Sequence, residues 1–379
     1  MNHWQETAEI LSRIAELERA GRRAALATVV RISGSAYRRP GAKFLIEDAG
    51  STLGSVSGGC LEADVREVAR AVLETGVPSL RHYSTGGDED VVWGLGLGCN
   101  GLVDVFVQPA TEGALPAVAE RLRELLAGDA PFAIATVLDG EAAGAMLAMG
   151  LGGSLSGTLG SEEIDRLAAE KARAVLAVIP PILATSAGPG GRSGVVRIGG
   201  RDEREVFVEA LPAPPHLIVC GAGDDARPLV AYAADAGFRV TLIDHREALL
   251  DPSWFPQAAR RVLARPEDPG IALPPAARSL AVVKTHGLAN DRDWTRRLLT
   301  AGLPYVGLLG PKERTAAILR EIGARDPEDT SRVFGPVGLD LGADGPRQVA
   351  ISIVAELLAF TTGRQPGHLS ARREAIHAI

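Results

Sequence analysis

The chain is poor in cysteine and in aromatic residues. Its 379 residues include three cysteines, Cys60, Cys99 and Cys220, and only 4% of its residues are aromatic. Three cysteines cannot all pair with one another, and their spacing fits neither a zinc site nor an iron–sulfur cluster. We therefore expect a cytoplasmic protein with reduced thiols, no disulfide framework and no metal held by protein ligands.

The chain also lacks an excess of basic charge and any long apolar run. It carries 40 basic and 47 acidic residues, for a net charge of −7, without a basic block, which argues against nucleic acid as a partner. No stretch is long and apolar enough to span a bilayer. Residues 1–6 are polar, and the amphipathic helix expected after them has no signal-peptide core. We expect neither a membrane anchor nor a membrane partner.

The length of the chain is sufficient for two domains, each with a substantial core. Its first half mixes apolar, β-prone runs with helical patterns in no regular alternation, which is typical of an α+β domain. Strands are expected at 24–32, 43–47, 79–83, 103–108, 132–138, 143–149 and 204–211, and helices directly after residue 60 and at 114–126 and 162–178.

The pattern changes near residue 212. A glycine-rich polar stretch at 185–202 and the stiff break Pro212–Pro215 precede the change. We place an N-terminal domain at 1–203, and we interpret 204–215 either as its last strand followed by the break or as a linker. A second domain is expected at 216–379.

Strands and helices alternate in this second domain, which predicts a Rossmann-like, doubly wound parallel sheet and places the whole chain in the α/β class. Strands are expected at 216–220, 239–244, 260–264, 279–285 and 303–309, and helices at 226–236, 291–300, 312–322 and 346–361.

A glycine-rich turn follows the first of these strands. Residues 221–226 fit the pattern G-x-G-x-x-A, in which Gly221 and Gly223 would let the backbone approach a pyrophosphate. Asp244 ends the next strand, where a carboxylate could bind a ribose hydroxyl. The fourth and fifth residues of the turn are both aspartates, which could cap the helix and would repel a phosphate. The turn therefore fits either dinucleotide binding or a Rossmann scaffold that has lost or altered its ligand.

Two other residues of the second domain have polar or reactive side chains near this turn. Cys220 ends an expected buried strand and is expected in the core. His286 follows an expected central strand at its carboxyl end, where such sheets bind ligands. It could serve as an acid/base group or a ligand contact, or it could be a loop histidine that bonds to its own turn.

The most informative run in the first domain is Ser57-Gly58-Gly59-Cys60-Leu61-Glu62. The apolar spacing after it predicts a helix, so Cys60 lies at or just before a helix N-terminus. Free backbone N–H groups and the helix dipole there favour a thiolate, and Gly58 and Gly59 could form an anion-binding nest. The alternative is that Cys60 is a small apolar residue at a tight packing spot.

Taken together, these motifs resemble the xanthine dehydrogenase accessory proteins of the XdhC/CoxI family. The likeness extends over nearly the whole length and keeps the order of the motifs. It is carried by residues 34–43 and 54–62, by 96–101, by the turn at 221 with 244–246, 285–287 and 307–310, and by 335–342 with 351–356.

The resemblance implies a maturation factor that carries a cofactor rather than a stand-alone enzyme. Such a protein would bind molybdenum cofactor (molybdopterin), support its sulfuration with a cysteine desulfurase, and insert it into a molybdenum hydroxylase client. The client would be of the xanthine dehydrogenase or aerobic carbon monoxide dehydrogenase type. The chain itself is short for such a hydroxylase and lacks the cysteine pattern of iron–sulfur clusters.

The resemblance also implies which residues meet the cofactor. Cys60 and Cys99 would meet across one site, where a thiolate could relay sulfur as a persulfide or contact the metal centre. The cofactor-binding residues expected in the first domain are Gly34, Ser35, Arg38, Gly41, Lys43, Ser57, Gly58, Gly59, Glu62 and Gly98, and those of the second are Gly221, Gly223, Asp244 and His286.

The sequence departs from the family pattern at the Rossmann turn, where Asp224 replaces the usual histidine, and at Asn100, where a third glycine is usual. The ligand of the second domain therefore stays open, with NAD(P) as one candidate. One alternative function is an NAD(P)-dependent oxidoreductase that uses this domain, and another is a docking or dimerisation module. A homodimer is possible, because the chain is rich in alanine and glycine and has apolar helices.

Overall fold

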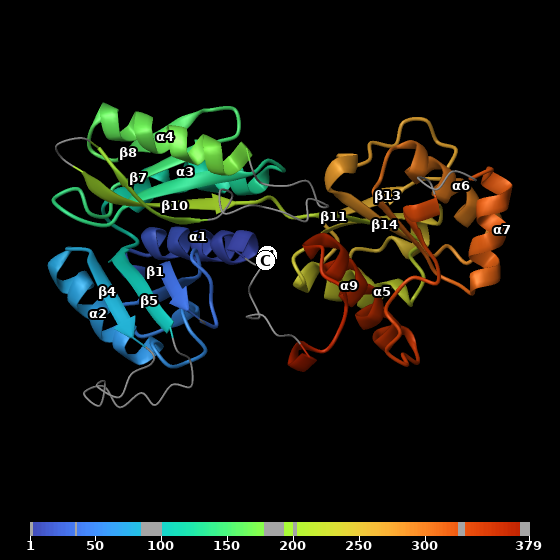
Figure 1. The fold of residues 1–379 in the computed structure, drawn as a ribbon, viewed down its shortest axis with the longest axis horizontal. Helices are drawn as coiled ribbons and strands as arrows, with labels where there is room; N and C mark the ends of the chain where they lie inside the picture. The colour runs from blue at the N-terminus through green and yellow to red at the C-terminus, as the bar shows by residue number, and fades with distance from the viewer. Residues whose placement is uncertain are drawn as a thin grey trace. The chain divides into compact units, whose positions relative to one another are not determined.

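The computed structural model describes residues 3–34, 36–84, 101–177, 193–199, 203–324 and 330–371 (Figure 1). These residues form two compact units that divide after Ala213. No helix in the described ranges is long and apolar enough to cross a membrane.

The first unit contains an antiparallel sheet with the strand order β3-β2-β1-β5-β4. Its strands are β1 (Ala24–Gly34), β2 (Lys43–Glu47), β3 (Thr52–Gly54), β4 (Ser79–Ser84) and β5 (Gly101–Pro109). Helix α2 (Glu62–Thr75) begins after the Cys60 loop and packs Val65, Ala69 and Val72 against this sheet. The spacing of these apolar residues, three or four apart, is what makes the stretch a helix with one buried face.

A second antiparallel sheet in the same unit has the order β8-β7-β6-β10-β9. Its strands are β6 (Phe132–Val137), β7 (Met146–Gly150), β8 (Leu155–Thr158), β9 (Gly194–Ile198) and β10 (Arg204–Leu211). Helix α4 (Glu162–Ala177) covers one face of it. Helices α1 (His3–Arg19) and α3 (Ala114–Ala127) share one apolar core with residues of both sheets. Residues 204–211 therefore form a strand of the first unit.

The second unit is built on a six-stranded parallel sheet with the order β13-β12-β11-β14-β15-β16. Its strands are β11 (His216–Cys220), β12 (Arg239–Asp244), β13 (Arg260–Leu263), β14 (Ser279–Val283), β15 (Tyr305–Leu308) and β16 (Val333–Phe334). Numbered within the unit, this is the Rossmann order 3-2-1-4-5-6. The fold prediction of an α+β unit followed by a Rossmann-like parallel sheet is confirmed.

Helices cover both faces of this parallel sheet. Helices α5 (Ala226–Asp235) and α9 (Pro346–Thr362) pack together on one face, and α6 (Leu288–Thr300) and α7 (Lys312–Ile322) lie on the other. Because both faces are covered, the central strands are continuous apolar runs rather than alternating ones. The strand order reverses between β11 and β14, and a crevice at their carboxyl ends is the expected ligand site of such a sheet.

Candidate functional site

The Cys60 loop connects β3 to helix α2 in the first unit. Cys60 is exposed and unpaired, two residues before the helix begins. Gly59 has a φ of +113°, a conformation that residues with a side chain rarely adopt. The backbone of Gly58 lies beneath the exposed ring of Tyr37, since a Cβ on Gly58 would lie 3.7 Å from the Tyr37 Cγ. The predicted position of Cys60 before a helix is therefore confirmed.

The side chain of Ser57 closes this loop. Its hydroxyl accepts hydrogen bonds from the backbone N–H groups of Gly59 (3.1 Å), Cys60 (3.0 Å) and Leu61 (3.1 Å). The same hydroxyl donates to the carboxylate of Glu62, which also accepts the Ser57 N–H at 2.9 Å. The expectation of free N–H groups before the helix is therefore wrong: the amides converge as in an anion nest, but a hydroxyl fills it.

The charge of Glu62 matters to what this nest can hold. Burial raises the pKa of Glu62, but hydrogen bonds from Ser57 and from the backbone of Glu62 and Val56 together outweigh burial and keep the pKa below its usual range. Glu62 is therefore ionised at neutral pH and lies directly behind the Ser57 hydroxyl. An anion that replaces the hydroxyl in the nest must also move this carboxylate away.

The basic residues expected around the loop lie in internal ion pairs. Arg38 donates to both carboxylate oxygens of Glu6, at 2.5 and 2.7 Å. Lys43 is buried and pairs with the buried carboxylate of Glu209 on β10, and its Nζ donates to the Gly41 carbonyl at 3.0 Å.

Gly41 is required where these charges meet. It has a φ of +99°, and a Cβ there would lie 2.6 Å from the His3 ring and 2.9 Å from the Glu209 carboxylate. Burial first, and then the Lys43 charge, lower the pKa of His3 to about 3, so its ring is neutral. The contacts of Arg38, Gly41 and Lys43 thus hold α1, β2 and β10 against one another.

The structure describes only part of the expected thiol site. Gly34 ends β1 and pairs with Gly101 at the start of β5. Ser35, Gly98 and Cys99 lie outside the described residues, so the meeting of Cys60 and Cys99 stays a prediction. The described residues contain no group of three or more histidine, cysteine, aspartate or glutamate side chains that could hold a metal.

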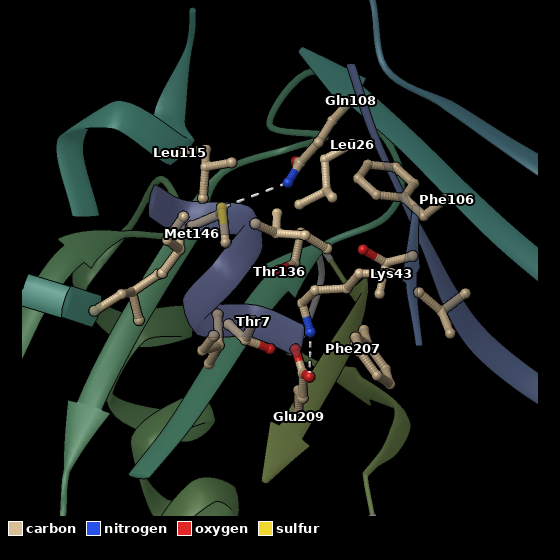
Figure 2. Close-up of a pocket in the computed structure, with 16 residues that line it drawn as sticks. Thr7, Leu26, Lys43, Phe106, Gln108, Leu115, Thr136, Met146, Phe207 and Glu209 are labelled. Atoms are coloured by element: carbon tan, nitrogen blue, oxygen red, sulfur yellow. Dashed lines mark hydrogen bonds and ion pairs between the residues drawn. The ribbon is translucent and has the colours of Figure 1, made fainter. Parts of the chain in front are cut away.

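A small cavity lies between the two sheets of the first unit (Figure 2). It has a volume of about 30 Å³, and its lining combines apolar side chains with Thr7, Gln108, Lys43 and Glu209. The Thr7 hydroxyl has no hydrogen-bond partner among the described residues. A cavity of this size holds one or two water molecules. It is too small for a pterin and is not a candidate cofactor site.

The Rossmann crevice was the second site expected from the sequence. Gly221 has a φ of +116°, and a Cβ there would lie 2.4 Å from the Lys284 carbonyl, so the turn packs directly against the end of β14. Cys220 is fully buried, and burial raises the pKa of its thiol. Its predicted position in the core is confirmed.

Asp244 is saturated by neighbouring donors. One oxygen accepts from the N–H of Ala222 (2.7 Å) and the Arg246 guanidinium (2.8 Å), and the other accepts from the Arg246 N–H and Nε, both at 2.9 Å. Burial alone would raise the pKa of Asp244, but these donors have the larger effect and lower the pKa to about 2. Asp244 thus binds the glycine-rich turn at Ala222 and its own loop at Arg246, and its four acceptor positions are taken.

Two residues of this crevice have polar contacts that the sequence did not predict. Asp225 does not cap helix α5, although the sequence allowed it, but forms an ion pair with Lys284 (2.5 Å) and a polar contact with His286 (3.2 Å). Lys284 is 2% exposed. A lysine directly after the apolar run 280–283 was the available signal, because a charged group is expected at the end of the strand, toward the crevice, rather than in the core.

The fold and these two regions define a class of protein: a two-unit chain that joins a pair of antiparallel sheets with an exposed cysteine loop to a Rossmann-like unit. A family model described as the XdhC and CoxI family matches residues 17–84, and one described as the XdhC Rossmann domain matches residues 217–357. The chain belongs to the XdhC and CoxI family, which confirms the resemblance seen in the sequence.

Individual proteins agree with this assignment. The chain is 31% identical over 335 residues to a probable xanthine dehydrogenase subunit of Bacillus subtilis, covering 88% of this chain and 92% of the relative. It is 27% identical to the uncharacterized protein YqeB of Escherichia coli, of which it covers 43%. A crystal structure described as a xanthine dehydrogenase from Bacillus halodurans matches with a TM-score of 0.72 and 26% identity, over 97% of this chain and 98% of that one.

Proposed function

We propose that this chain is a maturation factor for a molybdenum hydroxylase of the xanthine dehydrogenase type. It carries molybdenum cofactor as cargo, presents it for sulfuration by a cysteine desulfurase, and delivers it to the client. Membership in the XdhC and CoxI family supports this proposal. The relative from Bacillus subtilis and the related solved structure both carry the name xanthine dehydrogenase, which favours that client over carbon monoxide dehydrogenase.

The observation that carries the proposal is the arrangement of the Cys60 loop. Three backbone N–H groups converge within 3.1 Å of one point, the Ser57 hydroxyl, and one of them belongs to Cys60 itself. A phosphate oxygen of the molybdopterin that took the place of this hydroxyl would receive the same three donors. It would then lie beside an exposed thiol.

The exposed ring of Tyr37 adds a flat surface to this loop. Tyr37 is 74% exposed, and its ring rests against Gly58 on one side. A pterin is flat and conjugated, and aromatic rings stack on such groups with their faces offset. Tyr37 would thus hold the ring system of the cargo, the nest its phosphate, and Cys60 its metal end.

The test is molybdopterin binding and client activation by the full chain. Cys60→Ala should weaken binding at least tenfold and reduce activation of the cofactor-free client to a similar extent. Glu67→Ala is the matched control, because Glu67 lies exposed on helix α2 and bonds only to Arg70 among the described residues. Cys99→Ala tests the second predicted thiol. Full binding and full client activation by both cysteine variants would contradict a role for thiols.

A further inference from the structure

A charge cluster around the buried Lys284 lies at the point of the Rossmann sheet where ligands are expected. Lys284 follows β14 and Asp225 precedes helix α5, so both lie at the carboxyl ends of the two central strands. The strand order reverses between these strands, which is where open parallel sheets bind their ligands. The cluster therefore lies in the crevice in which a dinucleotide would be held.

Lys284 is the unusual member of this cluster. Its side chain is 2% exposed, and its Nζ lies 2.5 Å from the Asp225 carboxylate. Burial lowers its pKa, and the attraction of Asp225 opposes that shift. Its Nζ forms no well-oriented hydrogen bond among the described residues. A buried ammonium is tolerated only with a counter-ion, and the crevice supplies one from the protein itself.

The counter-ion is the carboxylate of Asp225, a residue that stands at the point of the turn where a dinucleotide would place its phosphates. In a G-x-G-x-x-A turn the pyrophosphate lies at the N-terminus of the following helix, and Asp225 is the residue immediately before helix α5. Its carboxylate turns toward Lys284 and His286 instead of capping the helix. Burial raises its pKa, but Lys284 and His286 outweigh burial and keep the pKa below its usual range. Asp225 is therefore an anion at neutral pH.

The backbone of His286 has an unusual conformation beside this cluster. Among the described residues it alone combines a side chain with a positive φ, of 62°. Such a conformation costs energy and persists where surrounding contacts hold it. The polar contact here is the 3.2 Å approach of His286 Nε2 to Asp225 Oδ2.

We propose that Asp225 acts as a tethered anion that fills the phosphate position of the Rossmann unit, so that the native protein binds no dinucleotide there. Lys284 and His286, beside the start of helix α5, form an anion site whose occupant is the protein's own carboxylate. The carboxylate that would bind the ribose of a dinucleotide is also occupied, because Asp244 accepts four hydrogen bonds from Ala222 and Arg246. The inference stands apart from the proposed maturation role and concerns a different unit.

The proposal predicts that removal of the carboxylate exposes an anion site. Calorimetric titration of the full chain with NADH, NADPH and inorganic pyrophosphate should give no binding to the native protein at millimolar concentrations. Asp225→Asn should bind pyrophosphate at least tenfold more tightly than native protein does. The gain should disappear in Asp225→Asn/Lys284→Met. Asp224→Asn is the matched control, because Asp224 lies in the same turn but is 89% exposed and pairs with Arg227 instead.

Stability provides a second measurement, because Asp225→Asn leaves Lys284 buried without its counter-ion. Millimolar pyrophosphate should raise the melting temperature of this variant and leave that of the native protein unchanged. Micromolar binding of NADH or NADPH to the native protein would overturn the proposal. So would an Asp225→Asn variant that gains no more affinity or stability from pyrophosphate than Asp224→Asn does.

Discussion

At the scale of single residues, the Cys60 loop depends on one hydroxyl. Ser57 Oγ accepts from three backbone amides and donates to Glu62. The sequence predicted that Cys60 lies directly before a helix, because this follows from local spacing, but it left open whether the thiol is exposed or packed. It did not predict that Ser57 would occupy the nest, since this depends on how the loop folds back on itself. Serine five residues before a glutamate has no fixed meaning in a sequence.

Substitution of Ser57 should therefore destabilise the protein more than loss of an exposed hydroxyl would. Ser57→Ala leaves three converging amides and one carboxylate without their partner, and we expect a loss of about 1–3 kcal/mol in the free energy of unfolding. Urea denaturation measures this loss. Thr75→Ala is the control, because Thr75 lies exposed at the other end of helix α2, and we expect a change of about 0.5 kcal/mol or less. Equal losses in the two variants would contradict this view of the loop.

The basic residues show a different limit at this scale. Arg38 and Lys43 were expected to contact the cofactor because they lie in the motif at 34–43 that carries the family resemblance. The structure places them against Glu6 and Glu209, and Glu209 is 166 residues from Lys43. No local pattern indicates a partner at that distance. From sequence alone, a charged residue in a motif can therefore be assigned to a ligand site, whereas in the folded protein it forms an internal ion pair.

At the scale of helices and strands, the central elements were predictable, but four of the edge strands were not. Every long apolar run in the described residues became a strand or a helix close to its expected bounds, because burial dictates its pattern. The strands that the sequence did not indicate are β3, β8, β9 and β16, and each lies at the edge of its sheet. Edge strands are short and partly exposed, so their sequences need no apolar run.

The two sheets of the first unit are linked by the buried pair of Lys43 on β2 and Glu209 on β10. Both side chains are nearly fully buried. Lys43→Met should cost about 3–5 kcal/mol in the free energy of unfolding, because it leaves a buried carboxylate without its partner. Lys43→Met/Glu209→Leu should recover most of that loss, since an apolar pair needs no counter-charge. Denaturant unfolding of the two variants measures the difference, and a double variant no more stable than the single one would contradict a coupled pair.

At the scale of the whole molecule, the chain joins two units that differ in what their expected sites offer. The first presents an exposed thiol beside converging amides. The second keeps the strand order of a dinucleotide-binding fold, but its phosphate and ribose positions are filled by Asp225 and by the contacts of Asp244. Composition and motif order could predict the fold and the family. They could not show how each glycine-rich turn is filled, by the Ser57 hydroxyl in the first unit and by the Asp225 carboxylate in the second, because these contacts depend on the fold.

The most direct test of the cargo site is alkylation of the cysteines in the full chain, followed residue by residue by mass spectrometry. Cys60 is exposed and should react readily, whereas the buried Cys220 provides an internal reference that should react only when the protein unfolds. Saturating molybdopterin should slow the alkylation of Cys60 at least tenfold and leave Cys220 unchanged. Equal rates at Cys60 with and without bound molybdopterin would contradict the proposal that this loop holds the cofactor.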